Sequence, residues 1–385
     1  MSRDPETAFR HGDYTVVCHR SLDAVARHAG TPGAGGTPPH CVDWARDVMG
    51  GKPWWLEVSG PGAAHPRGFA VTVIPTRALP GHRILRLEQL RFAPDPGAAE
   101  AAVRYLMDAA RRDTRIVRLN VDTFYGDSAE MDAGDAAMRR LGLAKPARSR
   151  LYTHTVRMDL SPSTDTILAG LHATTRRKIR LAGKRALELR VVNDARIGAR
   201  LDEILAETFG RTASRAEPQP WTQVIEYCRN HPDRARLVSA VRTDRDGPDA
   251  TIAFALGVRH ADHVEYAVAG STRPEDLHVA VGYAVAWELI CWARSAGARW
   301  FDFGGVTEHE DPTDARRGIR NFKLMFGADV AEVRREWTFV ARPTRHAWIS
   351  AAGWLTERVR RVARTLPSTT AASRITSGPL PRITG

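Results

Sequence analysis

The sequence predicts an α/β (α+β) fold of two units, each a sheet flanked by helices. Three observations support this class. The chain has 385 residues, which is enough for two domains of ordinary size. Its hydrophobic content of 43% and charged content of 26% are typical of a globular protein. Short β-rich stretches and longer stretches of helical periodicity follow a similar order in both halves, which is typical of layered α/β units.

The first unit is expected to span residues 1–158. Its strands are short runs rich in β-branched and aromatic residues, bounded by Gly and Pro. They are expected at residues 14–18, 54–58, 69–74, 83–92, 116–121 and 152–158. Helices are expected at residues 41–51, 97–112 and 129–143. The second of these follows Pro94 and Pro96, and the third closes at Gly142, as helix boundaries commonly do.

The second unit is expected to span residues 159–342. It opens with Ser163 or Thr164 as the cap of a helix that runs to about Ala186, with apolar side chains every three or four residues. Strands are expected at residues 187–192, 237–241, 251–258, 264–268 and 333–340, and from Trp300 onward. Further helices are expected at residues 204–209, 220–230 and 279–296.

Two segments follow these units. Residues 343–365 are expected to form an amphipathic helix whose apolar stripe, starting at Trp348 and Ala352, packs on the protein. Residues 366–385 are rich in Ser, Thr, Pro and Gly and are expected to be disordered.

The charge and the cysteine content limit the kinds of partner and site that the protein can have. The net charge of +12 at pH 7 indicates an anionic partner, such as nucleic acid, a phosphorylated small molecule or a membrane surface. The four scattered cysteines form no CxxC pair, so neither a zinc site nor a disulfide framework is expected, and no metal is assigned. No apolar run reaches the roughly 18 residues of a membrane helix, and no signal core is seen. We therefore expect a cytoplasmic protein without stable membrane insertion.

Residues 300–327 are the stretch around which the function is organised. Aromatic residues at its start, Trp300, Phe301 and Phe303, predict a buried strand. Gly304 and Gly305 then let the backbone turn or approach a ligand closely.

Lys323 lies near the end of the same stretch. The chain has 56 Lys plus Arg, and only five of them are Lys, so a compact ammonium is used sparingly here. A lone cation after a glycine-punctuated loop is suited to a site that handles negative charge. The alternative is an ordinary exposed lysine, the usual state of this residue type.

The order of motifs in this stretch resembles the signature of the Fem family, transferases that move an amino acid from aminoacyl-tRNA onto an amine. The matching positions are Phe301-Asp302-Phe303-Gly304-Gly305, then Phe322-Lys323, then Phe326-Gly327. The resemblance implies two GNAT-like domains, each with a mixed, mostly antiparallel sheet. Some members insert a helical hairpin, but here the chain runs directly from Asp194 to Asp202, so no coiled-coil arm is expected.

The resemblance also implies an activity. It predicts an aminoacyl-tRNA-dependent aminoacyltransferase that forms an amide bond on a small acceptor, either a peptidoglycan precursor or a peptide-type secondary metabolite. The co-substrate is aminoacyl-tRNA, no cofactor is expected, and the protein is expected to be a monomer.

Within this reaction, Lys323 is the candidate for stabilising the oxyanion formed on the ester, or for binding the terminal phosphates of the tRNA. Asp302 is the candidate for orienting the attacking amine, with capping of local backbone as the alternative. Glu265 and Tyr266 are further alternatives. Because the ester is already activated, a strong protein base is not required.

A basic helix provides the second part of the resemblance. Several of its cations fall away from the apolar stripe, as expected for a surface that tracks a phosphate backbone, although a solvated helix face would look the same. Phe322 joins this group through the Phe-Lys motif. The tRNA- or phosphate-binding candidates are Arg176, Arg177, Lys178, Arg180, Lys184 and Phe322.

Acceptor-binding residues are assigned by the same resemblance. They are Trp44, Arg46, Arg211, Arg215, Tyr266, Gly304 and Gly305. Two departures stand out: the family's Lys after Trp44 is replaced by Ala45-Arg46, and its aromatic and Arg partners downstream of Arg215 are replaced by residues 217–221. Both departures concern the identity of the acceptor.

Two other classes remain open. An acyl-CoA N-acyltransferase would bind the CoA pyrophosphate with a loop of the form [Arg/Gln]-x-x-Gly-x-[Gly/Ala] at a helix start, and the corresponding residues 273–282 lack this form. A non-catalytic nucleic-acid-binding protein would need only the positive charge.

Overall fold

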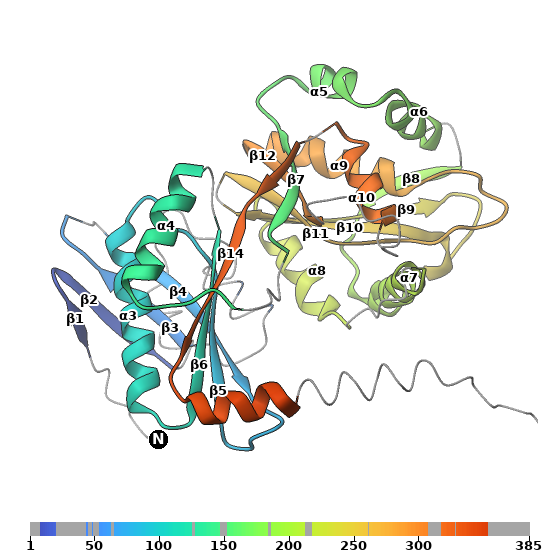
Figure 1. Ribbon diagram of the computed structural model, residues 1–385. Helices are drawn as coiled ribbons and strands as arrows, with labels where there is room; N and C mark the ends of the chain where they lie inside the picture. Colours follow the sequence, from blue (N-terminus) through green and yellow to red (C-terminus); the bar gives the residue numbers. More distant parts are fainter. Residues whose placement is uncertain are drawn as a thin grey trace, which may run out of the picture.

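The computed structural model describes residues 8–20, 44, 48, 54–62, 65–124, 128–146, 152–183, 186–211, 218–260, 262–306, 317–327 and 329–352. Over these residues the chain forms two mixed sheets of seven strands, each with helices packed on it (Figure 1). The predicted fold class is therefore confirmed. No helix in these ranges has the length and apolar character needed to cross a membrane.

The first sheet has mostly antiparallel neighbours and one parallel pair. Its strands lie in the order β1 (Phe9–His11), β2 (Tyr14–His19), β3 (Trp54–Ser59), β4 (Arg67–Pro75), β5 (Arg83–Leu90), β6 (Ile116–Phe124) and β14 (Arg334–Val340). The parallel pair is β5 and β6, which requires a crossover, and α3 (Pro96–Arg112) supplies it. α3 and α4 (Ser128–Arg140) bury their apolar faces in the core of this sheet.

The second sheet repeats this pattern. Its strands lie in the order β13 (Asp329–Glu332), β7 (His154–Asp159), β12 (Trp300–Val306), β11 (His263–Ser271), β10 (Thr251–His260), β9 (Ala235–Arg242) and β8 (Leu187–Val191). Here β11 and β12 are the parallel pair, joined through α9 (Gly282–Ser295). The remaining helices of this unit are α5 (Thr164–Gly170), α6 (Ala173–Ala182), α7 (Gly198–Gly210), α8 (Trp221–Asn230), α10 (Arg317–Leu324) and the short turns η2 (Ala195–Ile197) and η3 (Pro248–Ala250).

The second sheet is covered on both faces, as the side chains of β10 show, because they point alternately into two different cores. Ala253 and Ala255 belong to the core shared with α9, whereas Phe254 and Leu256 belong to the core shared with α7 and α8. Side chains at i and i+2 of a strand share a face, so this one strand contributes side chains to both cores. Every residue of β10 except Arg259 is buried, so this strand lies in the interior of the unit.

The two units exchange strands. β7 follows the helices of the first unit in sequence but pairs with β12 and β13 in the second sheet. β14 follows the helices of the second unit but pairs with β6 in the first sheet, with Trp337 opposite Val121. In Figure 1, β14 accordingly runs from the second unit into the first. The expected boundaries at residues 158/159 and 342/343 therefore do not follow the sheets, because the sequence pattern identifies a strand but not its partner.

The expected helix from residue 163 to about 186 is two helices. α5 ends at Gly170, and the next residue, Leu171, has an extended backbone. α6 starts after His172, whose Nδ1 accepts a hydrogen bond from the Thr174 N–H at 3.2 Å. Apolar spacing continues across the break, so periodicity alone did not reveal it. α6 ends at Ala182 and β8 begins at Leu187, and no helical arm lies between them among the residues described.

Residues 343–352 are helical and begin the expected C-terminal helix. Arg342 Nη2 donates to the Arg111 carbonyl oxygen at 2.8 Å, and Arg345 Nη1 donates to that of Thr114, so this end is fixed to the first unit. The expectation that Trp348 packs on the protein is wrong, since it is 73% exposed. The rest of this helix and the segment 366–385 lie outside the described residues.

Candidate functional site

A pocket with a volume of about 820 Å³ lies in the second unit. β11 forms its base, and its walls come from α7, the residues that lead into α9, the end of β12, and α10. Among the residues that the structure describes, five charged ones line it, and four of these are cations: Lys178, Arg211, Glu265, Arg273 and Lys323. The pocket is therefore suited to an anionic ligand that also carries one positive group.

The end of β12 shapes one wall of this pocket. Gly304 has a φ of +75°, and a Cβ there would lie 3.6 Å from the Lys323 Nζ. At Gly305 a Cβ would lie 2.3 Å from the Tyr152 ring, closer than real Cβ contacts come. The first glycine is needed for its backbone conformation and the second for lack of space. Both predicted glycines line the pocket.

Lys323 reaches the pocket from α10 and is only 8% exposed. Its Nζ donates a hydrogen bond to the Gly305 carbonyl oxygen at 2.8 Å, which leaves two of the three ammonium hydrogens for other partners. Burial lowers the pKa of Lys323 to about 8, while the negative charges of Asp302 and Glu265 act to raise it. The alternative of an ordinary exposed lysine is thus excluded by the structure.

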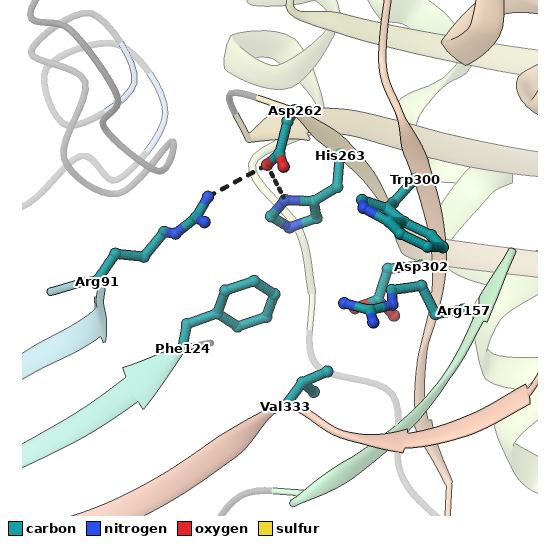
Figure 2. Close-up of a pocket in the computed structure, with 8 residues that line it drawn as sticks. All are labelled: Arg91, Phe124, Arg157, Asp262, His263, Trp300, Asp302 and Val333. Atoms are coloured by element: carbon teal, nitrogen blue, oxygen red, sulfur yellow. Dashed lines mark hydrogen bonds and ion pairs between the residues drawn. The ribbon is translucent and has the colours of Figure 1, made fainter. Parts of the chain in front are cut away.

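Asp302 does not face this pocket. It is 2% exposed and lines a second, much smaller cavity between the two units (Figure 2). Its Oδ1 accepts a hydrogen bond from the Gly304 N–H at 2.6 Å and lies against the Thr155 hydroxyl, which is itself 2.9 Å from the Gly304 carbonyl oxygen. Burial, and then the charge of Glu265, raises the pKa of Asp302. The residue therefore fixes the turn that presents Gly305 to Lys323, as the capping alternative predicted.

The small cavity lies in a tightly packed contact between the units. Phe124 of the first unit stacks on His263 with ring centroids 4.8 Å apart, and His263 stacks on His260 at the same distance. Arg91 donates to Asp262 at 3.1 Å, and Asp262 lies 3.7 Å from His263, as Figure 2 shows. This contact brings residues from both units to the rear of the β12 turn.

Glu265 connects this contact to the large pocket. Its Oε1 accepts from the Tyr152 hydroxyl at 3.1 Å, and its Oε2 lies 3.0 Å from His260 Nε2. Arg334, which starts β14, lies 3.6 Å from Oε1. Burial opposes ionisation of Glu265, but the hydrogen bond from His260 and the charge of Arg334 outweigh it and hold its pKa well below the usual range.

Tyr152 was not identified from the sequence. It precedes β7, lines the pocket, and packs its ring between Gly305 and the Arg334 guanidinium, 4.5 Å from the ring centroid. Strand exchange brings it there, and no local pattern signals such a position. The sequence identifies Glu265 only as an alternative to Asp302, because its partners in the site also come from distant parts of the chain.

The basic helix contributes less to the pocket than expected. Arg176 Nη1 donates to the Ala169 carbonyl oxygen at 2.8 Å and to that of Leu171, so it satisfies the end of α5. Lys178 does line the pocket, with its Nζ 4.2 Å from the Tyr283 ring centroid. Arg177 and Arg180 are exposed on α6, outside the pocket lining. Lys184 lies outside the described residues.

Three other predicted residues meet at the pocket. Tyr266 and Phe322 line it and form an aromatic wall with Tyr283, whose ring centroid is 4.8 Å from that of Phe322. Arg211 lines it as well, and its Nη2 donates to the Ser271 carbonyl oxygen at 2.7 Å.

Trp44 lies elsewhere. Its ring packs edge-on against Tyr227 at 5.0 Å, in the core formed with α7 and α8, and it is outside the pocket lining. Arg46 and Arg215 lie outside the described residues. In the part of the chain that the structure describes, no group of three or more His, Cys, Asp or Glu side chains is arranged to hold a metal ion.

Comparison with known proteins agrees with this architecture. Residues 169–324 match the model of the acetyltransferase (GNAT) domain. The solved structure of FemX is similar over 84% of this chain and 96% of its own, with a TM-score of 0.64 and 13% identity. The structure of L-PGS from Bacillus licheniformis is similar over 88% and 96%, with a TM-score of 0.52 and 11% identity. No curated protein sequence gives a match.

These likenesses concern the fold. Similarity to FemX over both units confirms the predicted Fem-like architecture of two GNAT-like domains. The chain therefore has a GNAT-type fold. Lys323 and the other residues that line the pocket lie inside the segment that matches the GNAT model, except Tyr152.

Proposed function

We propose that this protein is an aminoacyltransferase that uses aminoacyl-tRNA to form an amide bond on the amine of a small acceptor. One observation carries the proposal: a buried ammonium, Lys323, is fixed by the Gly305 carbonyl at the wall of a large pocket whose charged lining residues, among those described, are mostly cations. The net charge of +12 is suited to a polyanionic carrier, whose phosphates attract basic surfaces. The Fem-like fold supports the same reaction class.

In this reaction the neutral amine of the acceptor attacks the ester carbonyl carbon. The new C–N bond forms, the C–O bond to the ribose breaks, and the proton lost by the amine ends on the ribose oxygen or in solvent. Negative charge develops on the carbonyl oxygen in the tetrahedral intermediate. Lys323 has two hydrogens to donate to it, and a preoriented cation in a site of low dielectric constant stabilises such a charge strongly. No cofactor takes part, because the ester is already activated.

The residues that could bind the carrier and the acceptor differ from those expected. Four of the expected binding residues line the pocket. We retain Lys178 and Phe322 for the tRNA or its phosphates, and Tyr266 and Arg211 for the acceptor. Arg176 is occupied by backbone carbonyls, and we assign it a structural role. The proposal retains a monomer acting in the cytoplasm.

The match to the GNAT model favours one alternative, an acyl-CoA-dependent N-acyltransferase. The residues that lead into and start α9, from Val279 to Tyr283, line the pocket, and a pyrophosphate would bind at such a helix start. However, the backbone N–H groups of Val279, Val281 and Tyr283 already donate to carbonyl oxygens of this segment. Against it, the connection from Arg273 to Gly282 lacks the glycine pattern that lets a loop wrap around that group.

A transfer assay separates the two. The protein is incubated with tRNA charged with a pool of radiolabelled amino acids and with amine acceptors of both proposed kinds, a peptidoglycan precursor and small peptides. We expect label to move from tRNA to an acceptor, and we expect Lys323→Met to reduce this transfer by at least 100-fold. Lys145→Met is the matched control, because Lys145 is half exposed on the first unit and is outside the pocket lining.

Two outcomes would count against the proposal. Transfer from acetyl-CoA but not from charged tRNA would favour the alternative. Full activity of Lys323→Met would show that Lys323 does not take part in the reaction.

A further inference from the structure

Glu265 is the only carboxylate that lines the pocket in the part of the chain that the structure describes. It lies on β11 and shares the pocket with four cations. Its side chain is 18% exposed, whereas the neighbouring His260 is 3% exposed. Among these described residues, a ligand in the pocket thus meets one negative group and four positive ones.

This carboxylate is held in one place and kept ionised. The Tyr152 hydroxyl fixes Oε1 at 3.1 Å, and Gln89 Nε2 approaches Oε2 at 3.5 Å from the first unit. His260 and Arg334 hold the pKa of Glu265 well below its usual range despite burial. A group that stays ionised in this way is a poor general base near neutral pH, but it is a good partner for a substrate ammonium.

The reaction offers two amines, and only one of them benefits from such a partner. The acceptor amine must be neutral to attack, and a nearby carboxylate would hold its proton. The α-amino group of the donor does not react and is one carbon away from the ester carbonyl. A site that holds the carbonyl at Lys323 therefore needs an anion nearby for the ammonium. Glu265 is close enough for its charge to raise the pKa of Lys323.

We propose that Glu265 binds the α-ammonium of the amino acid carried by the donor and makes the site selective for an α-aminoacyl group that is not blocked. This inference rests on the proposed function. Glu265 thereby orients the ester so that its carbonyl oxygen points to Lys323. An acyl group that lacks the ammonium leaves the carboxylate without its ligand and is transferred poorly.

The test compares two donors that differ in one group. The first is the aminoacyl-tRNA that supports transfer, and the second is its α-hydroxyacyl form, made by deaminating the charged tRNA with nitrous acid. For the unmodified protein we expect kcat/KM to favour the amino form by at least 30-fold, as a charged hydrogen bond predicts. For Glu265→Gln we expect this ratio to fall below about threefold, with the rate of the hydroxy form nearly unchanged. Glu332→Gln, on β13 and outside the pocket lining, is the matched control and should keep the original ratio.

Several outcomes would overturn the inference. Equal losses for both donors would show that Glu265 only supports the structure. A change confined to the KM of the acceptor would show that Glu265 binds the other amine. If Glu265→Gln does not fold, Tyr152→Phe decides: it keeps the charge but frees Oε1, so a loss selective for the amino donor supports the inference and an equal loss overturns it. If the unmodified protein transfers from neither donor, the proposed function is wrong as well. If it transfers, but Glu265→Gln has the same kcat/KM ratio between the two donors, only this inference is wrong.

Discussion

At the scale of single residues, the main feature is a lysine whose burial lowers the stability of the folded protein. Lys323 is 8% exposed, and its hydrogen bond to Gly305 replaces only part of its lost hydration. Asp302 and Glu265 offset part of this cost through their charges. Such a destabilising group is typical of a site shaped by function, because an apolar residue would fill the same space at a lower cost.

Lys323→Met is therefore expected to make the protein more stable while it stops transfer. With a pKa of about 8 against 10.5 in the unfolded chain, burial of the ammonium costs on the order of 3 kcal/mol at pH 7. Between these two values the unfolded chain binds a proton that the folded chain does not, so the stability of the unmodified protein rises with pH. The advantage of the Met variant should hence shrink from pH 8 to pH 10.5. Denaturant unfolding at several pH values measures it.

Lys145→Met serves as the control here too, because Lys145 is half exposed and lies outside the pocket lining. A Met variant that is less stable than the unmodified protein at pH 7 would mean that the pocket holds the ammonium without cost.

How far the sequence could identify the site depends on the residue. Lys323, Gly304 and Gly305 belong to one short stretch, so a motif was enough to find them. Asp302 belongs to that stretch as well, but its direction depends on which way the strand faces, and the expected contact with the substrate was replaced by one with Thr155 and Gly304. Tyr152 reaches the pocket only through pairing of distant strands.

At the scale of elements, the end of β12 is the part that sets the geometry. Its aromatic residues predicted a buried strand, and Phe301 and Phe303 are indeed fully buried. The two helices α5 and α6 show the limit of such patterns. The break between them at Leu171 is stabilised by Arg176, and a polar contact of this kind leaves no trace in apolar periodicity.

Gly305→Ala tests the turn. Its new Cβ would lie 2.3 Å from the Tyr152 ring and 2.5 Å from the Tyr152 Cβ, so rotation of that side chain cannot relieve the contact. We expect a loss of about 1–3 kcal/mol in the free energy of unfolding, as for other overpacked sites. We also expect transfer to fall by at least 100-fold, because the Gly305 carbonyl that holds Lys323 must shift. Unfolding and the transfer assay on the same preparation measure both.

Gly170→Ala, at the end of α5, is the matched control, since a Cβ there meets no atom within 4 Å. Full activity of Gly305→Ala would show that the position of this carbonyl is not critical.

At the scale of the whole molecule, the two units form one structure through exchanged strands. β7 lies between β12 and β13 in the second sheet, and β14 completes the first. Between them, Arg334 at the start of β14 reaches Glu265, and Phe124 at the end of β6 stacks on His263. The sequence predicted the order of elements in both units, but strand partners are set by contacts between distant residues. The pocket therefore depends on the folding of both units.

Trp337→Ala tests this dependence. Trp337 lies on β14, is 1% exposed and belongs to the core of the first sheet, so its loss should lower stability by about 3–5 kcal/mol. Because β14 is covalently continuous with the pocket unit and starts at its Glu265 contact, we expect hydrogen exchange to accelerate equally in β4 of the first sheet and β10 of the second. Trp348→Ala, which removes a 73% exposed Trp, should change neither. Acceleration confined to the first sheet would show that the units unfold independently despite the exchange.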